Sequence, residues 1–198
     1  MGNPATHAAR DTRVPTTPYS PTMTTSALAK PITNATWINL VILVGSGLFV
    51  FGLIVSAVFA PEWRVLHVFQ ALIYVAVVVL TRRQSPWGFG AGVIIASFWN
   101  SIALATSTIV QDGIHELEAV ARTAQLQRPD ALLQLFAFFG HVLIIVACLA
   151  GFLRTRPGAR QWGQFAAGGV LAIVYLVAMV FAVGPPQGVA LMRRVFGL

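Results

Sequence analysis

The stretch that decides the fold runs from Phe98 to Phe152 and has three parts. It reads FWNSIALATSTIV (98–110), QDGIHELEAVARTAQLQRPD (111–130) and ALLQLFAFFGHVLIIVACLAGF (131–152). The first and last parts are apolar, whereas the middle part holds four of the six acidic residues of the chain. Two apolar segments long enough to cross a bilayer therefore flank a polar connection.

The whole 198-residue chain has the composition of a membrane protein. It is 57% hydrophobic and only 10% charged, with a mean hydropathy of +0.76. A soluble domain carries about 25% charged residues, so we expect the lipid bilayer to be the main surroundings of this chain. Its 13 Lys and Arg residues lie between apolar segments, and this placement indicates membrane topology rather than nucleic-acid binding.

Five apolar segments could each form a membrane-spanning helix, which needs about 20 mostly apolar residues. They are residues 37–60, 65–80, 87–110, 131–152 and 163–183. We therefore predict an all-α, polytopic transmembrane bundle over residues 36–184. A surface amphipathic helix at 112–127 would lie between spans three and four.

The two ends of the chain are predicted to lie outside this bundle. Residues 1–35 are rich in Thr, Pro, Ala and Ser and lack an apolar period, which predicts a flexible tail. Residues 185–198 are expected to form a short tail with an interfacial turn.

The placement of bases predicts the orientation of the bundle. If the N-terminus lies inside, the inner segments carry eight bases and one acid, and the outer segments carry five bases and five acids. The positive-inside rule then favours a cytoplasmic N-terminus and, with five spans, an outer C-terminus. Arg193 and Arg194 oppose this orientation, and an inner C-terminus would require that the second or fifth segment does not cross.

The acidic connection is itself amphipathic. Its apolar residues recur at helical spacing, which predicts a helix that lies on the membrane surface with its apolar side down. Asp112, His115 and Glu116 fall within one turn, where their side chains could converge on a metal ion. A solvated polar face is the favoured alternative, because the sequence contains neither HExxH nor CxxC.

Polar side chains within the spans are costly in lipid and normally face the interior of a bundle. The residues that we expect there are Gln70, Tyr74, Asn100, Gln134 and Tyr175, in addition to His67 and His141. Trp99 lies beside Asn100. Its ring either faces lipid or a partner chain, or forms part of a pocket wall.

Haem is the most specific cofactor hypothesis, with His67 and His141 as ligands from two helices. Their depths differ by roughly 9 Å at about 1.5 Å per residue, which is awkward for one haem. The alternative is that each histidine hydrogen-bonds a neighbouring helix. A pigment is a further possibility, since a chlorophyll or a carotenoid can be held by one histidine or by apolar packing alone.

Rows of small residues mark faces where helices approach closely, either within the chain or against another subunit. The rows are Gly52, Ser56 and Ala60; Gly88, Gly92, Ala96 and Asn100; and Gly168 with Ala172.

No predicted span contains Asp, Glu, Lys or Arg. Ion-coupled transporters and proton pumps generally need such residues within the membrane. We therefore expect a non-catalytic membrane subunit or accessory protein of a larger complex, with a redox or energy-converting complex as the first host to consider. The alternatives are a haem- or metal-binding membrane protein, and a small-solute carrier or channel lined by Gln70, Tyr74, Asn100 and His141.

Overall fold

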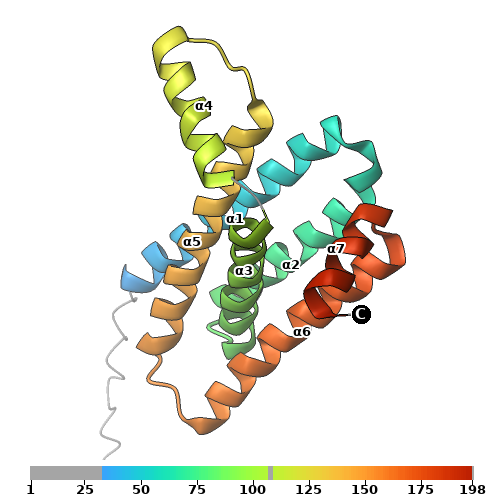
Figure 1. The fold of residues 1–198 in the computed structure, drawn as a ribbon. Helices are drawn as coiled ribbons and strands as arrows, with labels where there is room; N and C mark the ends of the chain where they lie inside the picture. The colour runs from blue at the N-terminus through green and yellow to red at the C-terminus, as the bar shows by residue number, and fades with distance from the viewer. Residues whose placement is uncertain (1–32, 107–108, 198) are drawn as a thin grey trace, which may run out of the picture. The chain divides into compact units, whose positions relative to one another are not determined.

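The computed structural model describes residues 33–106 and 109–197, and every regular element in these residues is helical (Figure 1). The elements are α1 (Thr33–Phe59), a 3₁₀ turn (Pro61–Trp63), α2 (Arg64–Arg82), α3 (Pro86–Thr106), α4 (Ile109–Thr123), α5 (Pro129–Arg154), α6 (Ala159–Val183) and α7 (Pro186–Phe196). All but the last three residues of the predicted N-terminal tail lie outside the described residues.

Five of these helices, α1, α2, α3, α5 and α6, are long and apolar enough to cross a membrane. The all-α transmembrane bundle expected from the sequence is therefore confirmed, including the more polar helix α4 between the third and fourth spans. Prolines define several helix starts. Pro86, Pro129 and Pro186 each begin a helix, where the missing N–H of proline leaves no hydrogen bond unmade.

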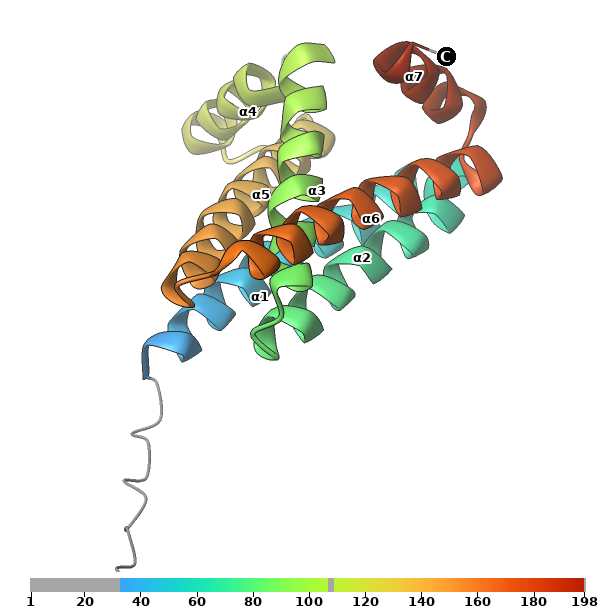
Figure 2. The same ribbon diagram turned by 90° about the horizontal axis from the view of Figure 1, so that it is seen from below.

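Helix α3 is the centre of the bundle. It packs against α2, α5 and α6, while α1 packs against α2 and α5. Figure 2 shows α3 crossing α6 and α2, with α4 and α5 on one side. The central position of α3 brings residues from its middle, including Asn100, against α5.

Glycines allow the helices to cross closely. A Cβ atom added at Gly45 on α1 would lie 2.6 Å from the Gly140 carbonyl oxygen on α5, and one at Gly140 would lie 2.8 Å from the Gly45 carbonyl oxygen. At the crossing of α3 and α6, a Cβ at Gly90 would overlap the backbone of Phe165. These contacts are between backbones, so a larger side chain cannot be accommodated by a rotamer change.

The predicted small-residue rows on α3 and α6 are occupied by packing within the chain. A Cβ at Gly92 would lie 2.7 Å from the Cys148 sulfur, and a Cβ at Gly168 would overlap the backbone of Trp87. On α1 the contact is looser, because the nearest atom to a Cβ at Gly52 is the Ala137 Cβ at 3.9 Å. The rows on α3 and α6 therefore need no other subunit to explain them.

The charged residues divide between the two ends of the bundle. One end holds the α2–α3 and α5–α6 connections, and we call it the basic end. Its charged residues are Arg82, Arg83, Arg154, Arg156 and Arg160. The opposite end holds all five acids of the described residues, which are Glu62, Asp112, Glu116, Glu118 and Asp130.

The C-terminal segment differs from its expected form, because residues 186–196 form helix α7 where a turn was expected. Pro186 opens the helix, and Gly197 ends it with a left-handed φ of 69°. Helix α7 packs at the end where α2 begins. Trp63 lies against Gly188, and the Phe98 and Phe196 rings stack at 6.0 Å between centroids.

Candidate functional site

Three buried polar side chains meet in the middle of the bundle. Tyr74 of α2, Asn100 of α3 and His141 of α5 are all buried. The Tyr74 hydroxyl lies 2.6 Å from His141 Nε2, and the Asn100 Oδ1 lies 3.0 Å from His141 Nδ1. We call these three residues the polar network. It joins three different helices through one imidazole ring.

The geometry fixes where the protons lie. The Asn100 amide donates from Nδ2 to the Phe138 carbonyl oxygen at 3.3 Å, so its Oδ1 faces His141 and can only accept. His141 Nδ1 therefore carries the proton. In the neutral ring Nε2 is then the acceptor, and the Tyr74 hydroxyl donates to it. Both ring nitrogens of His141 are thus hydrogen-bonded within the protein.

An aromatic side chain from a fourth helix covers the network. The Phe49 ring of α1 lies 4.4 Å from the Tyr74 ring and 4.3 Å from the His141 ring, centroid to centroid. Gly45, one turn earlier on α1, permits this approach of α1 to α5. Apolar cover of this kind keeps competing solvent away from the hydrogen bonds of the network and strengthens them.

A small cavity of about 180 Å³ lies beside the network. Asn100 and His141 form part of its wall, together with Trp99 and Gln134. The Trp99 Nε1–H is buried and has no hydrogen-bond partner among the described residues. An unpaired buried donor is costly.

The structure does not bring His67 and His141 together. His67 lies seven residues before Tyr74 on α2, which is about 10 Å along the helix axis, and its ring stacks on Trp63 at 6.1 Å. Because both nitrogens of His141 already have partners, iron could bind only after one hydrogen bond is given up. Haem on these two histidines stays a prediction from the sequence, as does a bound pigment.

Two of the three residues of the predicted metal site have separate partners. Asp112 forms an ion pair with Arg128 at 3.4 Å, and the buried Glu116 carboxylate accepts a hydrogen bond from the Gln127 backbone N–H at 2.6 Å. His115 is exposed. Within the described part of the chain, no group of three or more His, Cys, Asp or Glu side chains is arranged to hold a metal ion. A metal here stays a prediction.

The other residues expected in the bundle interior have different positions. Gln70 is buried, and its Oε1 has no partner among the described residues. Tyr175 is half-buried and donates to the Phe69 carbonyl oxygen at 3.3 Å, so it does not join the polar network. Gln134, which was expected in the interior, is exposed and lines the small cavity. Helix α4 covers Ala131 and Leu135 on the first turns of α5, which leaves Gln134 at the open side of the cavity.

Sequence reasoning did not identify Phe49 or the Phe138 carbonyl as parts of the site. Neither has a signal in the sequence, because an apolar ring and a backbone carbonyl look the same in every span. Trp99 did have a signal in the sequence, since a tryptophan in the middle of a span lies away from the usual interfacial belt.

Comparison with known proteins finds no family model that matches the sequence, and no match among curated proteins or solved structures.

Proposed function

We propose that this chain is a non-catalytic integral membrane component of a larger membrane assembly, with a redox or energy-converting complex as the first candidate host. The polar network is the observation that supports the non-catalytic part of this proposal. His141 uses both ring nitrogens to hold α2 and α3 against α5. A histidine bonded in this way fixes helix positions and has no free atom with which to act as a base or a metal ligand.

An uncovered apolar surface outside the spans supports a partner. Helix α4 packs on α5 through Gly113 and Glu116. On its other side, and in the connection that follows, Ile114, Leu117 and Leu126 are 45%, 51% and 53% exposed. These aliphatic side chains need a cover, which is either a partner chain or the membrane surface predicted for this helix.

Native mass spectrometry after extraction in a mild detergent tests the assembly. We expect a defined complex whose mass exceeds integer multiples of the 21.2 kDa chain mass. Replacing Leu117 with Asp should release the partner, whereas His115→Ala should retain it, because His115 is exposed and lies on the face of α4 opposite to Leu117. A particle that contains this chain alone, in membranes from its own source, would contradict the proposal.

The proposed orientation is N-terminus inside and C-terminus outside. The charges at the two ends of the bundle support it, because the basic end has five arginines and no acid among the described residues.

A second candidate function is binding or transport of a small uncharged solute in the cavity beside the polar network. The cavity itself favours it, because polar and aromatic side chains of Asn100, His141 and Trp99 form part of its wall. We expect Trp99→Phe to reduce solute flux into liposomes, whereas Trp87→Phe, outside this cavity, should not. Flux that is the same in both variants and in the unaltered chain would exclude this function.

A further inference from the structure

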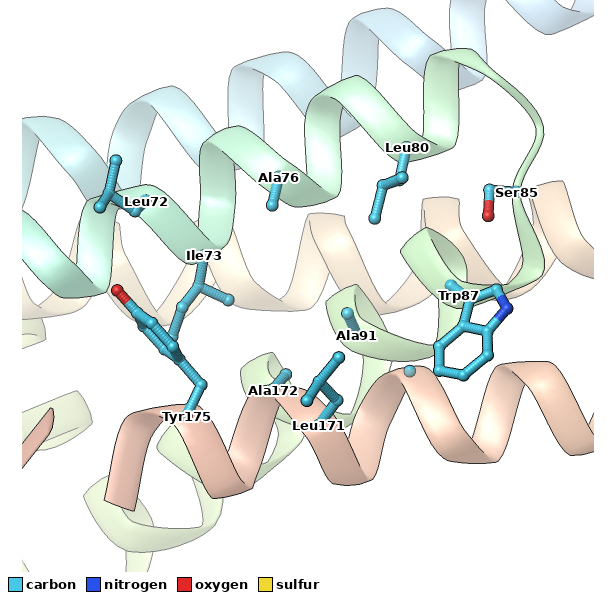
Figure 3. Close-up of a pocket in the computed structure, with 11 residues that line it drawn as sticks. Leu72, Ile73, Ala76, Leu80, Ser85, Trp87, Ala91, Leu171, Ala172 and Tyr175 are labelled. Carbon is cyan, nitrogen blue, oxygen red and sulfur yellow. The ribbon is translucent and has the colours of Figure 1, made fainter. Parts of the chain in front are cut away.

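A second, larger hollow lies on the other side of the bundle. It has a volume of about 570 Å³ and is formed by α2, α3 and α6 (Figure 3). Leu72 and Leu80 of α2 form one wall and Leu171 of α6 forms the other, while small residues such as Ala91 and Ala172 form the floor. Figure 3 shows these side chains facing one another across the space between α2 and α6. We call this hollow the lateral groove.

The lateral groove has the dimensions of one lipid chain in one leaflet. Its wall on α2 extends from Leu72 to Leu80, which is about 12 Å at 1.5 Å per residue. Half of the hydrocarbon core of a bilayer is about 15 Å. The groove opens on apolar side chains that face the lipid, since Leu72 is 50% and Leu171 is 60% exposed. An acyl chain could therefore enter sideways from the bilayer.

The two ends of the groove differ in chemistry. Tyr175 closes the deeper end, and its hydroxyl is already bonded to the Phe69 carbonyl oxygen. The other end lies at Ser85, in the connection that follows α2, and at Trp87, in the first turn of α3. A tryptophan ring at such a position is typical of the headgroup level of a membrane. The groove thus runs from the interface toward the middle of the bilayer.

Two arginines lie close in sequence to the interfacial end of the groove. Arg82 is the last residue of α2, and Arg83 comes two residues before Ser85, which lines the groove. Arg82 and Arg83 are exposed, and neither has an ion-pair partner among the described residues. The basic end has no acid in the described part of the chain that could neutralise them. Among the described residues, the charged side chains closest in sequence to this end of the groove, Arg82 and Arg83, are positive and would attract a negative charge.

We propose that the lateral groove binds one anionic phospholipid, with an acyl chain between α2 and α6 and its phosphate beside Arg83. The apolar walls account for the chain, and the unneutralised arginines select the anionic headgroup. This inference does not depend on the proposed function. A lipid held in this position would fill a gap between two helices of the same chain.

Lipid binding to the purified chain tests the proposal. The protein is freed of lipid and incubated with phosphatidylglycerol or phosphatidylcholine of the same acyl chains, and bound lipid is counted by native mass spectrometry. We expect one phosphatidylglycerol per chain and weaker retention of phosphatidylcholine. Arg83→Gln should weaken phosphatidylglycerol retention by about fivefold, which is the effect of one charge near an anionic membrane surface.

A space-filling variant separates the groove from general surface adhesion. Ala76 is exposed and lines the groove, so Ala76→Phe should fill it and abolish retention without disturbing the core. Val75 precedes it on α2, is also exposed and does not line the groove, so Val75→Phe is the matched control and should bind as the unaltered chain does. Equal binding of both lipids, or unchanged binding in Ala76→Phe, would overturn the proposal. So would a dimer of this chain that Ala76→Phe disrupts while no lipid is bound.

Discussion

Single residues matter most at the polar network, where the Tyr74 hydroxyl is the donor that His141 Nε2 needs. Tyr74→Phe removes the hydroxyl and keeps the ring against Phe49. We expect a loss of about 1 kcal/mol in the free energy of unfolding, in line with interhelical hydrogen bonds in membranes. Unfolding in mixed micelles, followed by circular dichroism, measures the loss.

Tyr175→Phe is the matched control for this prediction. The Tyr175 hydroxyl makes a longer bond, 3.3 Å, to a backbone carbonyl, and the side chain is only half-buried. Its loss should cost no more than about 0.5 kcal/mol. If Tyr175→Phe destabilised the protein as much as Tyr74→Phe, the polar network would not contribute more to stability than an ordinary hydrogen bond at the edge of the bundle.

The proton positions in the network are also testable. We expect ¹⁵N NMR of labelled histidine to find His141 protonated at Nδ1 and unprotonated at Nε2, because the Asn100 Oδ1 can only accept. In Tyr74→Phe the Nε2 signal should move toward that of a free acceptor, while the Nδ1 proton stays in place. A ring protonated at Nε2 would refute the assignment.

The sequence predicted part of this network and could not predict the rest. Asn100 and His141 stood out because polar groups in a span are costly. Tyr175 has the same chemistry as Tyr74 and a similar place in its span, yet it lies on a different face of the bundle. The choice between the two tyrosines depends on which helices adjoin, and this is set by packing over the whole chain.

At the scale of elements, the crossing of α1 and α5 depends on two facing glycines. Gly45→Ala would place a methyl group 2.6 Å from the Gly140 carbonyl oxygen, so the helices must separate. We expect a destabilisation of about 1–3 kcal/mol, as for other overpacked sites. Because the separation also moves Phe49 away from His141, the melting temperature should fall and the environment of the His141 ring should change.

Gly47 offers the control on the same helix. A Cβ at Gly47 would meet no atom within 4 Å, and alanine favours the helix over glycine by up to about 1 kcal/mol. Gly47→Ala should therefore be neutral or stabilising. A similar fall in melting temperature for both variants would mean that the close approach of α1 and α5 is not what limits stability.

Helix α7 illustrates what sequence patterns miss at this scale. Its start and stop signals, Pro186 and Gly197, are present in the sequence. Its length of 11 residues is too short for a span and marginal for an isolated helix in water. The helix is formed because Gly188 packs on Trp63 and Phe196 stacks on Phe98. Such tertiary contacts have no local signature.

At the scale of the whole molecule, the number of spans follows from the sequence because it depends only on the length and polarity of each segment. The neighbours of each helix do not follow in this way. The glycine row of α3 fits any helix with a flat face. Only the complete set of contacts places α2 and α5 there, where Gly88 meets Leu80 and Gly92 meets Cys148. For the same reason the lateral groove, which is a gap left between helices, could not be read from the sequence.

The orientation of the molecule gives the last prediction, and cysteine labelling in intact cells tests it. The native Cys148 is fully buried, so it adds little background. Ala159→Cys marks the basic end, and Gln125→Cys and Gln187→Cys mark the opposite end; all three positions are exposed. The five arginines of the basic end, with no acid among its described residues, should hold this end inside. A membrane-impermeant maleimide should therefore label Gln125→Cys and Gln187→Cys in intact cells, and Ala159→Cys only after permeabilisation. If only Ala159→Cys were labelled in intact cells, the basic end would lie outside and the proposed orientation would be wrong.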